Sequence, residues 1–385
     1  MDLYLQRIAL LREYIEQEKY RGYDPYDALK SPLFRLPILR SHKWLRFATQ
    51  QFVKRAPVNL RPLLAVPKGL NPVSLGLCIQ AYAYLTEVYP EEREELLNKI
   101  WQLAKQLQSL IPEGFSGVCW GYDFDWEARY AKIPAYQPTV VATGIITNAL
   151  FEAWLITREQ VCADLLLGAV PFVLKDLNRT EYENSICFSY SPFDTQQVLN
   201  ASLKGVRLLA QAHHIMGNND WAEIATTGVR FALEQQREDG AWPYSLAATG
   251  AWVDNYHTGY VLDCLEAYHT YIDNQLVRPA MDSGFTYYQE NLVDLDGAPK
   301  FYDKERYPID CTAAGQMLLT AVRFNNLPLA ETVMDWMLQN MQSSVGYFYF
   351  RQYAHFTNKT SFMRWSNAWM FTGLSYVAYA KRNTL

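Results

Sequence analysis

Residues Gln236 to Tyr260 read QREDGAWPYSLAATGAWVDNYHTGY, and this stretch decides how the rest of the chain is interpreted. A helical run ends at Asp239-Gly240, because glycine after such a run is a common C-terminal stop. The extended aromatic segment Trp242-Pro243-Tyr244 follows. Asp254-Asn255 then precedes a new apolar run, where Asp or Asn is typical of a helix start. Aromatic and ionisable residues therefore gather at the junction between two helices.

The same order of features recurs along the chain. Each time, an aromatic segment leads through a polar linker to a pair of small residues that opens a helix: Thr143-Gly144, Asn200-Ala201, Thr258-Gly259, Ala313-Ala314 and Asn367-Ala368. The second members of successive pairs are 57, 58, 55 and 54 residues apart, which is a regular repeat. Leu75-Gly76 is a sixth opening, 68 residues before Gly144, because the insertion GYDFDWEARYAKIPAYQP lengthens the linker between them.

The helices predicted from this repeat alternate between two kinds. Charged amphipathic helices are expected at 2–20, 91–110, 158–177, 219–237, 275–292 and 327–342. More apolar helices are expected to begin near 72, 140, 197, 257, 311 and 366. One-sided helices suit an outer ring, and helices that are apolar nearly all round suit an inner one. We therefore predict an all-α fold, a single (α/α)6 toroid domain of six helical hairpins over residues 1–385.

Composition excludes several classes of protein. The 385 residues are 50% hydrophobic and 15% aromatic, enough for a large core, and a net charge of −5 argues against a nucleic-acid-binding protein. The six cysteines show no metal or redox spacing, so we expect no metal and no cofactor. The N-terminal residues fit an amphipathic helix and not a signal peptide, and no run reaches membrane-spanning length. A cytoplasmic protein without a transmembrane segment is expected.

An irregular, basic and proline-rich segment is expected at about 25–70. Its cations are interleaved with Leu, Phe and Trp: Arg35, Arg40, Lys43, Arg46, Lys54, Arg55 and Arg61. Such a segment could contact an anion or a lipid head group, as in a peripheral membrane contact. The alternative is a solvated loop that closes the ring.

In such a ring all inner helices begin at one rim, which we call the mouth, so the polar linkers converge there. The candidate catalytic residues are Asp123, Asp125, Asp254, His257 and Asp310. The candidate substrate-binding residues are Trp120, Tyr122, Trp126, Arg129, Tyr136, Tyr190, Asp194, Trp242, Tyr244, Tyr302, Arg364, Trp365 and Asn367. Neighbouring carboxylates push their pKa values apart and can supply an acid and a base. Arg129 or Arg364 could bind an anionic group such as a uronate.

Each of these residues also has a purely structural interpretation. Asp194, Asp254 and Asp310 stand where helix caps are needed, and His257 could be a hydrogen-bonded interior histidine. The aromatic side chains could pack between hairpins. Convergence of several carboxylates, an arginine and a histidine on one rim exceeds what capping requires. Aromatic rings beside carboxylates fit sugars, whose apolar faces stack while their hydroxyls find polar partners.

Several stretches resemble a bacterial family of α/α-toroid proteins over nearly the whole chain. They are WGYDFDWEAR with PTVVATG, CFSYSPFD with LNASLKG, DGAWPYS with VDNYHTGYVLDCLEAY, and APKFYDKERYPIDCTAAGQ. The resemblance implies a protein encoded within surface or extracellular polysaccharide biosynthesis clusters and loosely related to prenyltransferase and squalene-cyclase repeats. It implies no agreed catalytic residues.

A broader similarity concerns triterpene cyclases. Gly228, Phe231, Gln236, Gly240 and Trp242 fit most of their QW repeat, with Ala232 in place of Leu. We interpret this match as architecture, with Gln and Trp tying one hairpin to the next. Pro308 to Ala313 can be laid on the cyclases' acidic motif DxDD-T-A, but the first and last acids are Pro308 and Cys311 here. Protonation of an alkene is therefore in doubt.

Three hypotheses for function remain open. The first is a lyase, hydrolase or epimerase acting on a surface polysaccharide or its precursor, with a glycan or other small molecule in a central cavity. The second is a class II terpenoid cyclase. The third is a non-catalytic glycan-binding assembly subunit. An open groove with several carboxylates favours the first, a closed apolar cavity with one acid the second, and carboxylates that all cap helices the third.

Overall fold

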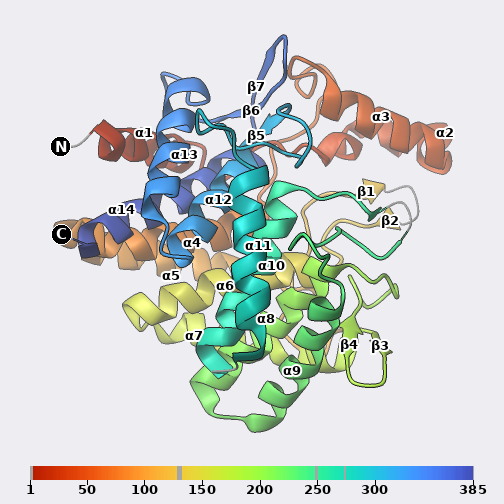
Figure 1. The fold of residues 1–385 in the computed structure, drawn as a ribbon. Helices are drawn as coiled ribbons and strands as arrows, with labels where there is room; N and C mark the ends of the chain where they lie inside the picture. The colour runs from red at the N-terminus through yellow and green to blue at the C-terminus, as the bar shows by residue number, and fades with distance from the viewer. Residues whose placement is uncertain (1–2, 128–131, 248–249, 273–274, 385) are drawn as a thin grey trace.

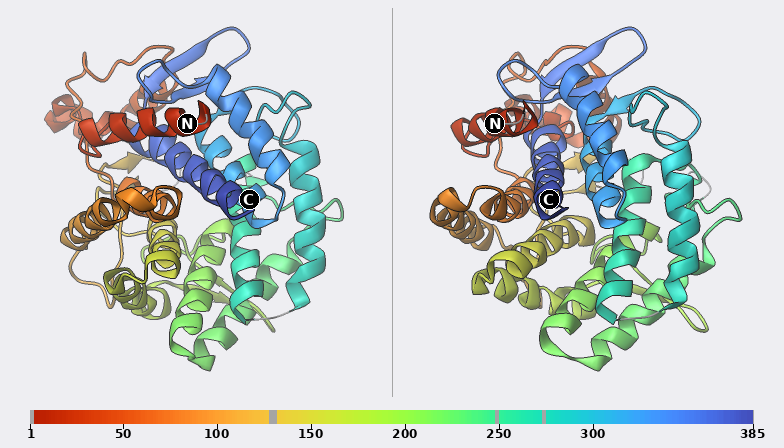
Figure 2. Two further views of the ribbon diagram at one scale, coloured as in Figure 1. Left: turned by 90° about the vertical axis from the view of Figure 1, so that its left-hand side faces the viewer. Right: turned by 60° about the vertical axis from the view of Figure 1, so that its left-hand side comes forward.

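A closed ring of helices forms the centre of the computed structural model, which describes residues 3–127, 132–247, 250–272 and 275–384. The inner helices are α4 (Pro72–Val88), α6 (Val140–Thr157), α8 (Leu199–Met216), α10 (Asn255–Ile272), α12 (Cys311–Arg323) and α14 (Trp369–Thr384). Each packs against the next along the chain, and α14 packs against α4. Figure 2 shows the colours following one another round the ring until the C-terminal helix meets the N-terminal one. The ring is therefore closed.

An outer layer covers this ring. Its helices are α1 (Leu3–Gln17), α5 (Arg93–Ser109), α7 (Gln160–Gly168), α9 (Asn219–Glu234), α11 (Arg278–Asn291) and α13 (Leu327–Asn340). Short 3-10 turns precede two of them (Pro90–Glu92 and Gln275–Val277), and a π-helical turn follows α7 (Phe172–Asp176). Each of α5, α7, α9, α11 and α13 packs against the inner helix before it, and α1 packs against α14. The (α/α)6 prediction is confirmed.

The small residues at the helix openings permit close contact between neighbouring inner helices. A methyl group on Gly144 of α6 would lie 2.6 Å from Cβ of Lys204 on α8. A methyl group on Gly259 of α10 would lie 2.8 Å from Cγ of Gln316 on α12. Both distances are shorter than carbon atoms tolerate, so the repeat of small residues reflects the spacing of the helices.

The hairpins are tied by side chains that reach from one unit to the next. Gln236 donates from Nε2 to the carbonyl of Ala280 on α11 at 2.9 Å, and the ring of Trp242 packs against Gly284 of the same helix, where a methyl group would lie 2.3 Å from Cζ3. Gln342 makes the corresponding bond to the carbonyl of Arg7 on α1 at 3.0 Å, where the chain closes on itself. The architectural interpretation of the Gln and Trp motif is thus confirmed.

Short antiparallel strands decorate the linkers. They pair as β1 (Trp126–Glu127) with β2 (Lys132–Ile133), and as β3 (Arg179–Glu181) with β4 (Ile186–Phe188). A third sheet has the order β5 (Ile309–Asp310), β6 (Tyr349–Gln352), β7 (Thr357–Ser361). In Figure 1 they lie along the upper and right-hand edge, away from the loops that follow the inner helices. The linkers that precede the inner helices therefore share one rim.

The segment at 25–70 is more ordered than its composition predicts. It contains two 3-10 turns (Asp27–Lys30 and Pro32–Arg35) and the helices α2 (Pro37–Ser41) and α3 (Lys43–Arg55). The expectation of an irregular segment is wrong for α3, because buried Gln50 and Val53 fix one face of this helix on the protein. Two of its predicted anion contacts are internal instead: Arg46 pairs with Glu127, and Arg61 pairs with Asp27.

One described helix, α6, is long and apolar enough to cross a membrane by length and composition. The expectation that no run reaches this length is therefore wrong. The 18-residue window is 72% buried inside the protein, as an inner helix of a ring must be.

Candidate active site

The mouth holds a cavity of about 300 Å³ that is walled by aromatic rings. First-turn residues of the inner helices line it, including Val141 of α6, Tyr256 of α10 and Thr312 of α12. The rings are Tyr26, Tyr122, Phe124, Trp126, Tyr190, Tyr244, Trp252, Tyr256, Tyr260, Trp365 and Trp369. We call this the mouth cavity. The predicted convergence of the linkers at the helix openings is confirmed.

A second cavity of about 500 Å³ adjoins it. The two share Tyr26, Trp252, Tyr256 and His257 in their linings. The adjoining cavity, as we call it, extends toward α3 and toward the strands β5 and β6. A ligand larger than one sugar ring could therefore occupy both cavities and pass over His257.

Asp254 and His257 form a hydrogen-bonded dyad where the two cavities meet. Oδ2 of Asp254 lies 2.7 Å from Nδ1 of His257, and Oδ1 accepts the backbone N–H of His257 at 3.0 Å. Trp252 donates from Nε1 to the same Oδ2 at 3.0 Å. Asp254 is buried, so it fixes the ring of His257 and favours a proton on Nδ1. Nε2, the other nitrogen, is then an acceptor that can act as a base.

Lys54 of α3 is a second ionisable group at the adjoining cavity. Its Nζ donates to the hydroxyl of Tyr26 at 2.5 Å and lies 4.0 Å from the centre of that ring. Burial, together with the charge of Arg351, lowers the pKa of Lys54 to about 7. Burial raises the pKa of Tyr26 to about 12, so the phenol stays protonated. The pair can accept or return a proton near neutral pH.

Arg364 lines the mouth cavity and packs against an aromatic ring there. Its Nε and Nη2 donate to the two carboxylate oxygens of Asp24 at 2.6 and 2.9 Å. The guanidinium carbon is 4.7 Å from the centre of the Tyr122 ring. The expectation that Arg364 binds a uronate by its fork is wrong, because Asp24 already occupies that fork. Its remaining edge can contact a ligand hydroxyl.

Asp310 is built into the wall between the cavities. Oδ1 accepts the N–H groups of Thr312 and Ala313 at 2.9 and 3.2 Å, which caps α12. Arg351 and the indole of Trp365 donate to its oxygens as well. All four partners are donors, so Asp310 is bonded as a carboxylate and is absent from the lining of either cavity. It supports the site and does not contact its contents.

Many of the predicted residues are brought together. Tyr122, Trp126, Tyr190, Tyr244, His257, Arg364 and Trp365 line the mouth cavity, and Asp254 and Tyr302 line the adjoining one. Burial raises the pKa of Tyr190 well above its ordinary value, so its hydroxyl remains a hydrogen-bond donor. These residues come from five linkers that are far apart in the sequence.

Four of the predicted carboxylates line neither cavity: Asp310, as described above, and Asp123, Asp125 and Asp194. Asp123 pairs with Lys30 at 2.8 Å and accepts from the amide of Asn71 at 2.8 Å. Asp125 accepts the backbone N–H of Ala135 at 2.8 Å, across the insertion. The expectation that Asp123 and Asp125 line the mouth is wrong, because the aromatic residues that alternate with them, Tyr122, Phe124 and Trp126, take the side that faces the cavity.

Asp194 holds a local turn and does not cap α8. It accepts from the backbone N–H groups of Tyr190 and Gln196 at 3.1 and 3.0 Å. The cap position of α8 is Val198, whose side chain makes no capping bond. A direct substrate contact from Asp194 is therefore not supported.

Four other predicted ligand contacts lie away from the cavities. Trp120 is buried and donates to the carbonyl of Leu107 at 2.9 Å, as Trp242 does in its own hairpin. Asn367 is buried and accepts the N–H of Phe348 at 2.9 Å. Tyr136 is exposed outside both linings. Trp120, Trp242 and Asn367 are therefore structural, and Arg129 lies outside the described residues.

Sequence reasoning missed several residues of the site. Trp252 and Tyr256 belong to the same linker as the dyad, so its aromatic density was a usable signal. Asp24, Tyr26 and Lys54 come from the N-terminal segment, which has no counterpart in the repeat. No pattern in the sequence marks these three for the mouth.

The described residues offer no ready metal site. Among them, no three His, Cys, Asp or Glu side chains are grouped closely enough to hold a metal ion. All six cysteines are buried and free, and burial raises the pKa of Cys119 to about 12.

The fold and the mouth define this chain as one of the six-hairpin toroids, a class that includes carbohydrate-active enzymes. A cellobiose 2-epimerase from Bacillus thermoamylovorans is 13% identical, with a TM-score of 0.58 over 80% of this chain and 87% of the epimerase. A sugar epimerase from a ruminal bacterium is 12% identical, with a TM-score of 0.60 over 83% and 90%. A family 76 α-mannanase from Bacteroides thetaiotaomicron is 14% identical, with a TM-score of 0.57 over 80% and 87%.

An unsaturated glucuronyl hydrolase specific for heparin is also similar, at 12% identity and a TM-score of 0.59 over 83% of this chain and 89% of that one. At such identities the likeness shows the fold alone. No protein-family model matches the sequence, and no curated protein matches it significantly.

Proposed function

We propose that the protein is a carbohydrate-active enzyme of the epimerase kind, which moves a proton at a sugar carbon beside a carbonyl group. The observation that supports this proposal is the dyad of Asp254 and His257 at the junction of two aromatic-walled cavities. We further propose that the substrate is a cytoplasmic precursor, or the reducing end, of a surface or extracellular polysaccharide.

The shape and lining of the mouth cavity suit a sugar ring. Rings such as Tyr244 and Trp252, which stack 4.8 Å apart, provide flat apolar faces. His257, Arg364 and the protonated phenols provide donors and acceptors for hydroxyls. This combination is the usual chemistry of sugar recognition. It is less suited to a polyene, which would need fewer polar contacts.

The proposed reaction uses the groups of the site that can accept or donate a proton. In the open-chain form of a sugar, Nε2 of His257 can remove the proton from the carbon beside the aldehyde, which leaves an enediolate. Tyr26 and Lys54, which line the adjoining cavity together with His257, can return a proton to that carbon. Return to the opposite face inverts the carbon, so only a proton moves and no bond between sugar units breaks.

Hydrolysis is less well supported by the arrangement. Glycosidases generally need two carboxyl groups about 5 to 10 Å apart that flank the bond to be cut. Among the described residues that line the two cavities, Asp254 is the single carboxylate, and its oxygens already hold His257 and Trp252. A cyclase is also less well supported, because the donors around Asp310 leave it no proton to give.

A non-catalytic glycan-binding subunit is the second candidate. It is favoured by the observation that both acids of the mouth, Asp254 and Asp310, cap helices. In that case the dyad serves only to fix the position of His257, and the cavity binds sugar without turnover.

Proton exchange with solvent separates the two candidates. The protein is incubated in D2O with a panel of reducing disaccharides, and NMR follows deuterium at the carbon beside the aldehyde. We expect exchange with the parent protein and a loss of about 100-fold or more in His257→Asn, with sugar binding retained. Asp254→Asn keeps a good capping residue but removes the charge beside His257, so we expect slower exchange and an intact fold.

His214→Gln is the matched control, because this exposed histidine lies near the C-terminal end of α8, away from the mouth. It should exchange deuterium as the parent does. Sugar binding by the parent without exchange would support the binding subunit. Release of a monosaccharide without exchange would instead support a hydrolase.

A further inference from the structure

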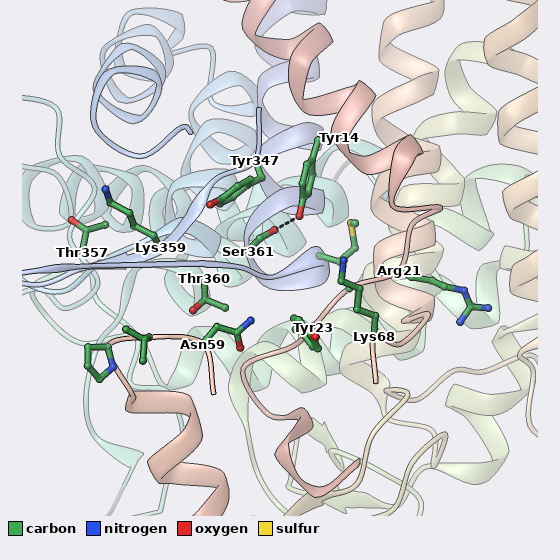
Figure 3. Close-up of a pocket in the computed structure, with 14 residues that line it drawn as sticks. Tyr14, Arg21, Tyr23, Asn59, Lys68, Tyr347, Thr357, Lys359, Thr360 and Ser361 are labelled. Atoms are coloured by element: carbon green, nitrogen blue, oxygen red, sulfur yellow. Dashed lines mark hydrogen bonds between the residues drawn. The ribbon is translucent and has the colours of Figure 1, made fainter. Parts of the chain in front are cut away.

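A pocket of about 560 Å³ lies beside the mouth, at the place where the N-terminal helix closes the ring (Figure 3). Segments from four regions form it: the end of α1, residues 21–23, residues 57–59 with Lys68, and Tyr347 with β7 and Met363. We call it the side pocket. Its lining shares no residue with either cavity of the mouth.

The charges of the side pocket all have one sign. Arg21, Lys68 and Lys359 line it, and its lining includes no carboxylate. Lys68 pairs with Glu18, while neither Arg21 nor Lys359 forms an ion pair with any described residue. In Figure 3 the three cations are spread across the pocket, with Lys359 and Arg21 at opposite sides and Lys68 between them. They do not converge on one point, as they would around a single phosphate.

Rings and hydroxyls accompany these cations. The rings of Tyr14 and Tyr347 lie 5.2 Å apart, and the hydroxyl of Tyr14 is 2.8 Å from Oγ of Ser361. Thr357 and Thr360 add further hydroxyl groups, and all five side chains are visible in Figure 3. Aromatic faces with hydroxyl groups suit a sugar chain, and the spread cations suit a sugar chain that carries repeated negative charges.

The side pocket and the mouth cavity lie on opposite sides of the same two paired segments. Tyr23 pairs with Phe362 in a parallel bridge, and Met363 donates its N–H to the carbonyl of Tyr23 at 3.1 Å. Tyr23 and Met363 face the side pocket, whereas Tyr26 and Arg364, a few residues along the same segments, face the mouth cavity. A chain bound in the side pocket would therefore be held close to the mouth.

We propose that the side pocket is a second binding site for an anionic polysaccharide chain, such as one containing uronates. This inference rests on the carbohydrate function proposed for the mouth and assigns the class of glycan. The side pocket holds the acidic part of the chain by its cations, while a terminal unit enters the mouth. The negative net charge of the protein would otherwise repel such a chain, so a local group of cations is needed.

The test is calorimetric binding of tetragalacturonate, with maltotetraose as a neutral probe of equal length and inorganic phosphate as a free anion. The double variant Lys68→Gln/Lys359→Gln removes two cations. We expect about tenfold weaker binding of tetragalacturonate, since exposed ion pairs each contribute a modest amount. The affinity of the parent should fall as salt is added. Maltotetraose should bind equally to the parent and to the double variant.

Lys105→Gln/Lys175→Gln is the control, because it removes the same charge from exposed sites on the outer layer. Equal weakening in the control would overturn the proposal, since it would show an effect of net charge alone. Unchanged binding in the double variant would overturn it too, and would place the acidic chain elsewhere. Phosphate that binds as strongly as the tetrasaccharide would indicate a simple anion site. If the double variant does not fold, Lys359→Glu replaces it, since Lys359 is exposed on β7.

The proposed function of the mouth is tested separately by deuterium exchange on neutral disaccharides. The Lys68→Gln/Lys359→Gln variant should incorporate deuterium into these disaccharides at the same rate as the parent protein. Loss of tetragalacturonate binding in the double variant, with normal deuterium exchange, supports the side pocket as a binding site. Absence of deuterium exchange in the parent protein refutes the epimerase proposal, but the binding result for the side pocket remains valid.

Discussion

Two tryptophans ten residues apart in the same linker should respond in opposite ways to truncation. Trp242 is 2% exposed, and its indole donates to the carbonyl of Ala232 at 2.9 Å. Its ring packs so closely on α11 that a methyl group at Gly284 would lie 2.3 Å from Cζ3. Trp252 is 42% exposed, lines the mouth cavity and stacks on Tyr244. The first is part of the hairpin, and the second is part of the site.

The expected magnitudes differ accordingly. Trp242→Ala removes a buried ring, at about 3 to 5 kcal/mol, and leaves a buried carbonyl without its donor, at about 1 kcal/mol more. An unfolding entropy of roughly 2 cal/mol/K per residue gives about 0.8 kcal/mol/K for 385 residues, so a loss of about 4 kcal/mol lowers Tm by about 5 °C. Trp252→Ala loses one partly solvated stacking contact, at about 1 kcal/mol, which corresponds to about 1 °C.

The assay combines thermal and urea unfolding with calorimetric binding of a sugar that the parent protein binds. Trp242→Ala should unfold at lower temperature and lower urea concentration, with the affinity of the folded protein preserved. Trp252→Ala should unfold nearly as the parent does and bind the sugar more weakly. Equal melting temperatures of Trp242→Ala and the parent would refute the structural role of Trp242. A large loss of stability in Trp252→Ala would refute its assignment to the site.

Three further predictions concern charge and packing. Because burial lowers the pKa of Lys54 to about 7, its amine loses above that pH the proton that it would return to the sugar, so deuterium exchange should decrease between about pH 6 and 8; Lys54→Met should abolish this decrease, and an unaltered pH profile would exclude Lys54 from the reaction. Asp24→Asn leaves the buried guanidinium of Arg364 without its charged partner and should reduce the free energy of unfolding by about 3 to 5 kcal/mol in urea; a loss below about 1 kcal/mol would show that solvent replaces the pair. Gly144→Ala should cost about 1 to 3 kcal/mol through overpacking against α8, and Gly205→Ala, where the nearest atoms are 3.3 Å or more away, should cost clearly less; equal losses would contradict the close-packing argument.

The toroid could be predicted from the sequence because close packing of the inner helices requires a small residue at each helix opening. A small residue recurs wherever two inner helices come within contact distance near their first turns, as at Gly144 and Gly259. Helix polarity then follows from position in the inner or outer ring. Both signals are local in sequence and repeat at every hairpin, so no knowledge of long-range contacts is needed to recognise them.

The site could be predicted only where its residues belong to the repeat. Tyr244 lies in the linker before α10 and His257 lies in the first turn of that helix, and every hairpin has these two positions, so their place at the mouth could be predicted correctly. Asp24 and Lys54 reach the mouth through a segment that occurs once, and no periodicity indicates where it packs. The prediction for Asp123 is wrong for a related reason. Its carboxylate is already bound by Lys30 of that segment and by the amide of Asn71, which stands at the start of the next helix.

The residues that cap the inner helices differ between openings, and this difference indicates which caps also serve the site. At the openings of α4 and α6 the caps are neutral, and the side chains of Asn71 and Thr139 accept one backbone N–H each, at 3.0 and 3.1 Å. At the openings of α10 and α12 the caps are Asp254 and Asp310, although a neutral side chain would cap as well. In both, the oxygen that capping leaves free holds a second group: the imidazole three residues later in one case, and Arg351 in the other. A carboxylate at a helix opening of this ring thus carries a charge that capping does not explain, and that charge is directed at the partner that shapes the mouth.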